Sequence, residues 1–151
     1  MKKHYSLNYL SSDFYNKYNS KNYPEIECKP SRPYLVMLIK IDKNTYAIPF
    51  RTNIRHKYCY KFKHSNRMTN AVTGLDYTKA VIVNDPIYIG SGATIDNKEF
   101  VELNNKYYFI VKQFKKYVDG YSDYVNGKLN EYEKRKYQYS TLKYFHNELG
   151  L

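Results

Sequence analysis

The pattern of apolar and polar positions changes between the first and second parts of the chain. Short runs of β-forming residues predict strands in the first part, and these cover residues 4–7, 34–41, 45–50, 80–83 and 87–89. From residue 100 the apolar positions follow at intervals of three and four, as on one face of a long helix: Phe100, Leu103, Tyr107, Ile110, Phe114 and Tyr117. Gly120 is expected to end this helix. Strands followed by helices predict an α+β domain with a small antiparallel sheet and a helical C-terminal half.

The remaining segments show weaker patterns. Residues 8–19 carry apolar side chains four positions apart, which predicts a short amphipathic helix. Residues 22–33 contain three prolines and predict a loop. Residues 57–74 are basic and poorly periodic, and we expect a long loop with some ordered structure. Further helical stretches are expected at residues 121–136 and 140–149.

The strands at residues 34–41 and 45–50 are expected to form a hairpin, because residues 42–44 (Asp-Lys-Asn) have turn chemistry. Pro49 cannot donate a backbone hydrogen bond, so it is expected to end the returning strand or to lie on an edge. The polar residues 51–56 would then be held at the end of a strand. Binding and catalytic groups are common on such loops.

The overall composition limits the class of protein. A chain of 151 residues fits one domain over residues 1–151. The mean hydropathy is −0.77, no apolar run is long enough to span a membrane, and the N-terminus has no apolar signal core. Two cysteines, Cys28 and Cys59, make neither a disulfide framework nor a structural zinc site. We therefore expect a soluble, cytoplasmic protein.

The positive charge is concentrated in one segment. The net charge is +11, and residues 29–68 hold ten basic residues against one acid, Asp42. An AT-rich gene would enrich lysine along the whole chain, yet four of the five arginines also fall in this segment. Local basicity of this kind predicts a surface that binds a polyanion.

The residues of this segment favour chemistry without a metal ion or another cofactor. Hard cations need several carboxylates, and the segment offers only Asp42. RNA can instead be cut by its own 2′-hydroxyl, if a protein moves protons and stabilises charge on the phosphate. Side chains able to do this stand together in one hexapeptide, and they are the candidate catalytic residues: Arg51, Thr52, Asn53, Arg55 and His56.

Each of these residues has an expected role and an alternative. Arg51 and Arg55 would hold phosphate oxygens, because a guanidinium binds phosphate through two donors. Thr52 would orient the 2′-hydroxyl or the phosphate, with Asn53 assisting, and His56 would move a proton. A Thr-Asn pair after a strand is also typical of turns, and a lone histidine is often structural.

Candidate RNA-binding residues lie in the basic segment and on the long helix. Cations would contact phosphates, and tyrosines would stack on unpaired bases. The candidates are Arg32, Tyr34, Lys57, Tyr58, Tyr60, Lys61, Lys63, Arg67, Lys112, Lys115 and Lys116. The three lysines of the helix fit a solvated face equally well.

Three blocks of the sequence resemble the ToxN/AbiQ superfamily of type III toxin–antitoxin systems. The first block is the predicted hairpin, residues 32–50 (RPYLVMLIKIDKNTYAIPF). The second, residues 74–83 (GLDYTKAVIV), is similar to the CptN and TenpN branches, and residues 139–142 (YSTL) are similar to a Phe-Ser-Leu-Leu element near the family's C-terminus. The blocks occur in the family's order over most of the chain, and CptN is the branch that the chain resembles most.

The resemblance implies a small, strongly curved antiparallel sheet of the Kid/MazF barrel type, surrounded by helices. It implies a toxin that is a metal-independent, sequence-specific endoribonuclease, which cuts single-stranded RNA and leaves a 2′,3′-cyclic phosphate. Its partner would be a small repeated RNA antitoxin folded as a pseudoknot. The toxin would cut the antitoxin precursor into units and stay bound to them in a closed protein–RNA assembly. Cellular or phage RNA would be the other substrates.

The resemblance also implies site residues. Thr52 matches the family's active-site hydroxyl after the proline of the returning strand, with Arg51, Asn53 and Arg55 nearby. Arg32 matches a basic residue before the first strand. The chain has Arg-Thr-Asn where the ToxN pattern has Thr-Ser-Pro, so the division of roles between Thr52 and Asn53 stays open.

Two other functions fit parts of the sequence. A non-catalytic RNA-binding module would use the same basic segment and tyrosines without turnover. A basic interaction domain encoded by an AT-rich gene would bind polyanions weakly and without a preference for RNA. Salt would abolish this binding.

Overall fold

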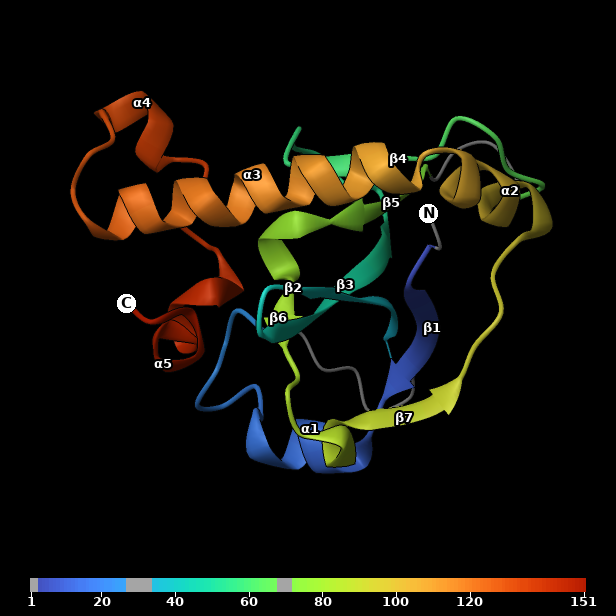
Figure 1. Ribbon diagram of the computed structural model, residues 1–151, viewed down its shortest axis with the longest axis horizontal. Coiled ribbons are helices and arrows are strands. Elements are labelled where there is room, and N and C mark those ends of the chain that lie inside the picture. The colour runs from blue at the N-terminus through green and yellow to red at the C-terminus, as the bar shows by residue number, and fades with distance from the viewer. Residues whose placement is uncertain (1–2, 27–33, 68–71) are drawn as a thin grey trace.

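An antiparallel sheet forms the centre of the computed structural model, which describes residues 3–26, 34–67 and 72–151 (Figure 1). Its strands are β1 (Tyr5–Leu10), β2 (Leu35–Ile41), β3 (Asn44–Thr52), β4 (Cys59–Lys61), β5 (Thr73–Asp76), β6 (Val81–Ile82) and β7 (Ile89–Gly92). Their order is β4-β5-β3-β2-β1-β7, and β6 also pairs with β3. The α+β class and the antiparallel sheet are confirmed. Within the described residues, β4 and β7 stand at opposite ends of this order and do not pair with each other, so a barrel is not confirmed.

Four of the helices follow the last strand, as predicted for the C-terminal half: α2 (Asn97–Asn105), α3 (Tyr107–Val125), α4 (Glu131–Lys134) and α5 (His146–Leu149). Helix α1 (Ser12–Lys17) lies between β1 and β2, and there are short 3-10 turns η1 (Tyr77–Lys79), η2 (Pro86–Tyr88) and η3 (Thr141–Tyr144). Figure 1 shows α3 running past β4 and β5, with α2 at one end and α4 at the other. The Phe114 ring of α3 packs on Tyr46 of β3, with the ring centroids 5.2 Å apart. Burying one such side chain stabilises the fold by about 1.5–3 kcal/mol.

The predicted hairpin is present as β2 and β3. Ile41 pairs with Asn44, so the turn itself consists of Asp42 and Lys43, and Asp42 takes a positive φ of 56°. Asn44 belongs to β3, and its side-chain amide donates to the Glu148 carbonyl at 3.0 Å. The turn is thereby tied to the end of the chain.

Pro49 neither ends the returning strand nor lies on an edge of the sheet, so that prediction is wrong. β3 continues through Pro49 to Thr52, and Pro49 pairs with Val36 of β2. On the other side of β3, pairing with β6 stops at Ala47 and pairing with β5 starts at Phe50. Pro49 lies between these two pairings, where β3 has no partner strand on that side. Its lack of a backbone N–H is tolerated there because no hydrogen bond of the sheet needs it.

The first helix is shorter than its pattern predicts. Residues 8–10 belong to β1, where Asn8 pairs with Val36, and α1 begins only after Ser11. The Ser11 hydroxyl accepts a hydrogen bond from the Phe14 amide at 3.2 Å, which caps the helix. Pairing with β2 therefore overrides the helical spacing at the start of this segment.

The long helix differs from its prediction in two places. It is divided at Lys106 into α2 and α3, and α3 continues past Gly120 to Val125. A Cβ atom at position 120 would overlap the Tyr137 hydroxyl, which donates to the Tyr117 carbonyl at 2.8 Å. Gly120 is therefore needed for close packing against Tyr137 and does not end the helix.

The basic stretch at residues 57–74 is more ordered than predicted, since it contains β4 and the start of β5. At residues 87–89 the predicted strand is wrong for two positions, because Ile87 and Tyr88 belong to η2 and only Ile89 begins β7. The strand predicted for residues 80–83 is present only at its two middle positions, as β6. Among the described residues, no helix is both long and apolar enough to cross a membrane.

Candidate functional site

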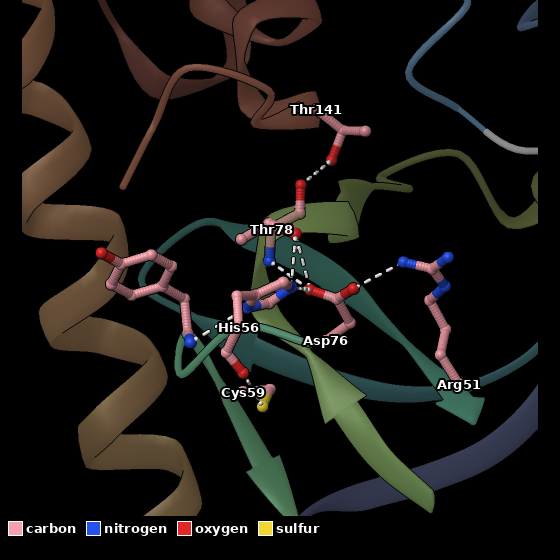
Figure 2. Close-up of polar contacts among 7 residues, drawn as sticks. Arg51, His56, Cys59, Asp76, Thr78 and Thr141 are labelled. Carbon is pink, nitrogen blue, oxygen red and sulfur yellow. Dashed lines mark hydrogen bonds and ion pairs between the residues drawn. The ribbon is translucent and has the colours of Figure 1, made fainter. Parts of the chain in front are cut away.

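A buried carboxylate, Asp76, lies where β5 ends and η1 begins (Figure 2). Its side chain is 0 % exposed. Asp76 caps η1, because its Oδ1 accepts hydrogen bonds from the Thr78 amide at 3.0 Å and from the Thr78 hydroxyl at 2.6 Å. Thr78 is held in turn by the Thr141 hydroxyl, which donates to the Thr78 carbonyl at 3.3 Å.

Arg51 and His56 meet on this carboxylate. The Arg51 guanidinium donates to Asp76 Oδ2 at 2.7 Å, and His56 Nε2 lies 3.2 Å from Asp76 Oδ1 (Figure 2). Arg51 pairs with Gly74 across β3 and β5, so Asp76, two positions further, is on the same face of the sheet. The register of the two strands therefore places the guanidinium against the carboxylate.

The charges of the site favour an ionised Asp76. Burial alone would raise the pKa of Asp76, but hydrogen bonds from His56 and Thr78 and the interaction with Arg51 outweigh it and lower the pKa below its usual value. The Arg51 and His56 side chains are 27 % and 32 % exposed. A fixed negative charge thus lies beneath two nitrogen-bearing groups that reach the surface.

The hydrogen bonds of His56 define its tautomer. The Tyr58 amide donates to Nδ1 at 3.0 Å, so Nδ1 is unprotonated and the ring proton is on Nε2, facing Asp76. The His56 and Tyr58 rings also stack, with centroids 5.7 Å apart. Both ring nitrogens have protein partners, so proton exchange with a substrate requires one of these bonds to open.

The other candidate catalytic residues are neighbours of this cluster along the chain. Thr52 is exposed and is on the opposite face of β3 from Arg51, since neighbouring residues of a strand alternate. Asn53 has a positive φ of 57°, and its amide donates to the Val72 carbonyl at 3.1 Å, which is turn geometry. Arg55 is exposed. Asp76 connects Arg51 to His56. Among the described residues, no hydrogen bond or ion pair connects Thr52, Asn53 or Arg55 to Asp76.

The candidate RNA-binding residues divide by exposure. Exposed members are Lys57, Lys61, Lys63, Arg67, Lys112, Lys115 and Lys116, and half-buried members are Tyr34 and Tyr58. Lys115 forms an ion pair with Asp119 at 3.1 Å along α3. Tyr60 is buried and its hydroxyl donates to Glu102 at 2.5 Å, so its ring is in the core. Arg32 lies outside the described residues.

Carboxylates of α2 hold the loop that carries Lys63 and Arg67. Glu102 accepts hydrogen bonds from the amides of Lys63, at 2.9 Å, and His64, at 2.7 Å. Glu99 Oε2 lies 3.2 Å from Arg67 Nε. This anchoring keeps the exposed Lys63 and Arg67 in place on the surface next to α2.

Sequence reasoning did not identify Asp76 as a site residue. The available signal was the one acid in a mostly apolar block, residues 74–83, where a carboxylate must have partners if it is buried. The partners themselves could not be read from the sequence, because they depend on the pairing of β3 with β5.

The chain matches no protein-family model, no curated protein and no solved structure. In residues 3–26, 34–67 and 72–151, no three His, Cys, Asp or Glu side chains are grouped so that they could hold a metal ion.

Proposed function

We propose that this protein is a metal-independent endoribonuclease that cuts single-stranded RNA at the end of β3. The observation that carries the proposal is the cluster in which Asp76 holds Arg51 and His56 at the surface, next to the exposed residues Thr52 and Arg55. A cation, an imidazole and a hydroxyl at one strand end are the groups that cleavage by the 2′-hydroxyl needs.

In the proposed reaction, Arg51 and Arg55 bind the non-bridging oxygens of the scissile phosphate and stabilise the charge that develops there. Thr52 orients the 2′-hydroxyl, and Asn53 holds the turn and assists. Asp76 is a positioning residue for Arg51 and His56. Because Asp76 keeps the imidazole proton on Nε2, His56 Nδ1 accepts the 2′-hydroxyl proton after the substrate displaces the Tyr58 amide. The 2′-oxygen bonds to phosphorus as the bond from phosphorus to the 5′-oxygen breaks, and the departing 5′-oxygen takes up a proton from solvent water.

The wider biological part of the proposal rests on the resemblance of the sequence blocks to the ToxN/AbiQ superfamily. The protein would act in the cytoplasm as a growth-inhibiting toxin with a fold related to the Kid/MazF barrel. A repeated pseudoknot RNA would be both its substrate and its inhibitor, bound in a closed assembly. Two of the three blocks, residues 32–50 and 74–83, include strands that form the proposed site.

A non-catalytic RNA-binding module is the second candidate. The observation that favours it is that both nitrogens of His56 are already bonded within the protein, while the surrounding lysines are exposed. Such a module would bind RNA through phosphates and leave it intact.

Cleavage of RNA in the presence of EDTA distinguishes the two candidates. We expect the purified chain to cut single-stranded RNA in EDTA and to leave 2′,3′-cyclic phosphate ends. Thr52→Ala and Arg55→Ala are expected to lower the rate by a factor on the order of 10²–10³, because each removes a group that binds the transition state. Arg135→Ala, at an exposed position outside the site, is the matched control and should keep the parent rate.

Intact RNA after incubation with the parent chain would favour the binding module. Activity that disappears with EDTA and returns with divalent ions would contradict the proposed chemistry. Full activity of both folded variants at positions 52 and 55 would show that the site is elsewhere.

A further inference from the structure

A groove lies beside the candidate active site, between the loop before β4, α3 and α4. Its volume is about 420 Å³, and residues with cationic or aromatic side chains on its wall are Lys57, Tyr58, Lys116, Tyr132, Lys136 and Tyr137. Tyr132 and Lys136 were not identified from the sequence. Tyr58 belongs to both the candidate active site and the groove, because its ring stacks on His56 and the residue also lines the groove.

Three ammonium groups converge on this groove. Lys57 Nζ is 5.9 Å from the centroid of the Tyr58 ring, and Lys136 Nζ is 5.7 Å from the same centroid. Lys116 comes from the adjacent turns of α3. The three ammonium groups carry the same charge and repel one another. An anion placed between them would relieve the repulsion.

These cations are not neutralised by ion pairs within the described part of the chain. The carboxylates of the groove are Asp119, which pairs with Lys115, Glu133, which accepts a hydrogen bond from the Asn130 amide, and Asp123. Burial, then the charges of Lys116 and Lys57, lower the pKa of Lys136, and the charge of Glu133 opposes this shift.

The groove also offers an aromatic surface to a ligand. Tyr132 is 67 % exposed, although a ring of this size is usually more buried, and Lys57 Nζ lies 5.9 Å from its centroid. An exposed ring beside cations is the combination that binds a nucleotide of a single strand, whose base stacks while its phosphate contacts lysine.

We propose that this groove binds one nucleotide of the single-stranded RNA that is cut at the end of β3, with its phosphate between Lys57, Lys116 and Lys136 and its base on Tyr132. The inference rests on the proposed function and extends it, because it assigns a second RNA contact to α4. Tyr58 stacks on His56 and also lines the groove, so it connects the two sites. The RNA strand would therefore leave the cleavage site past His56 and Tyr58. Duplex RNA would not fit this mode, since its bases are already paired and stacked.

Binding of a fluorescent 2′-O-methyl RNA oligonucleotide, measured by anisotropy, tests the proposal, because this probe lacks the attacking hydroxyl and stays intact. We expect Lys136→Gln and Tyr132→Ala each to weaken binding by about tenfold, through loss of a phosphate contact or of a stacked base. Tyr132→Phe keeps the ring and should bind as the parent does. Lys134→Gln makes the same change of charge two positions earlier, at the end of α4, at a lysine paired with Glu131, and should also bind as the parent does.

The slope of binding against salt gives a second readout. Lys136→Gln should reduce the slope by about 0.7, the value for one phosphate contact on a single strand, whereas Tyr132→Ala should leave the slope unchanged. Thermal melting of each variant confirms that the fold is retained.

Three results would overturn the proposal, and they have different consequences. If the parent binds the probe and the variants at positions 132 and 136 bind equally well, the groove is not an RNA contact and the proposed active site stands. If Lys134→Gln loses as much affinity as Lys136→Gln, only the overall charge matters. If the parent binds no RNA at all, the inference and the proposed function both fail.

Discussion

At the scale of single residues, Asp76 determines the geometry of the candidate site. It is the buried acceptor for Arg51 and His56, and it also caps η1 through Thr78. A buried carboxylate is tolerated only when hydrogen bonds and charges replace the water that it has lost. The groups that satisfy Asp76 are therefore held in fixed orientations, two of them at the surface.

Asp76→Asn is expected to separate positioning from binding. The amide has nearly the same shape but no charge, and its NH₂ group cannot accept hydrogen bonds from Arg51 or His56. We expect the free energy of unfolding in urea to fall by about 1–3 kcal/mol. We also expect the cleavage rate to fall on the order of 10²-fold while RNA affinity changes little. Asp13→Asn, at an exposed position of α1, is the control. An unchanged cleavage rate in the Asp76 variant would mean that Asp76 does not position the site.

At the scale of secondary-structure elements, the sequence was informative where the pattern is local. The β2–β3 hairpin and the inward face of α3 follow directly from their runs and spacing, because burial on one side selects the side chains there. The ends of elements were less predictable. Gly120 has the chemistry of a helix end, yet its role in α3 depends on Tyr137, a residue in a later segment.

Gly120→Ala tests this account of α3. Alanine raises intrinsic helix propensity by about 1 kcal/mol, so a glycine without a packing role would be improved by the change. Here the added methyl group must displace the buried Tyr137 hydroxyl from the Tyr117 carbonyl, and we expect a net loss of about 1–2 kcal/mol in urea denaturation. Gly92→Ala, where nothing lies within 4 Å of the new Cβ, is the control. Stabilisation by Gly120→Ala would show that the contact with Tyr137 is easily relaxed.

At the scale of the whole molecule, an ion pair joins the loop after α1 to the C-terminal segment. Lys143 Nζ is 2.5 Å from Glu25 Oε1, and the Tyr144 hydroxyl donates to Glu25 Oε2. Hydrogen bonds from Lys143 and Tyr144 lower the pKa of Glu25 from 4.5 to about 2. The residues involved are more than a hundred positions apart, so the contact exists only in the folded chain.

This ion pair predicts how stability depends on pH. Because the pKa of Glu25 is lower in the folded state, its contribution is fully present above pH 4.5 and is lost as the pH falls towards about 2. We expect Glu25→Gln to be less stable than the parent at neutral pH, and the difference in unfolding free energy to disappear over that acidic range. Glu131→Gln removes an exposed ion pair on α4 and should change stability little. A difference for Glu25→Gln that stays constant down to pH 2 would contradict the assignment.

The sequence by itself determined the fold class, the hairpin, the helical second half and the basic segment that includes residues 51–56. These features depend on periodicity and composition, which are properties of neighbouring residues. Only the tertiary structure decided which polar groups meet: Arg51 and Asp76 are 25 positions apart, and Lys57 reaches Tyr132 from another element. Such contacts are set by the register of strands and the docking of helices, and burial of the whole core determines both.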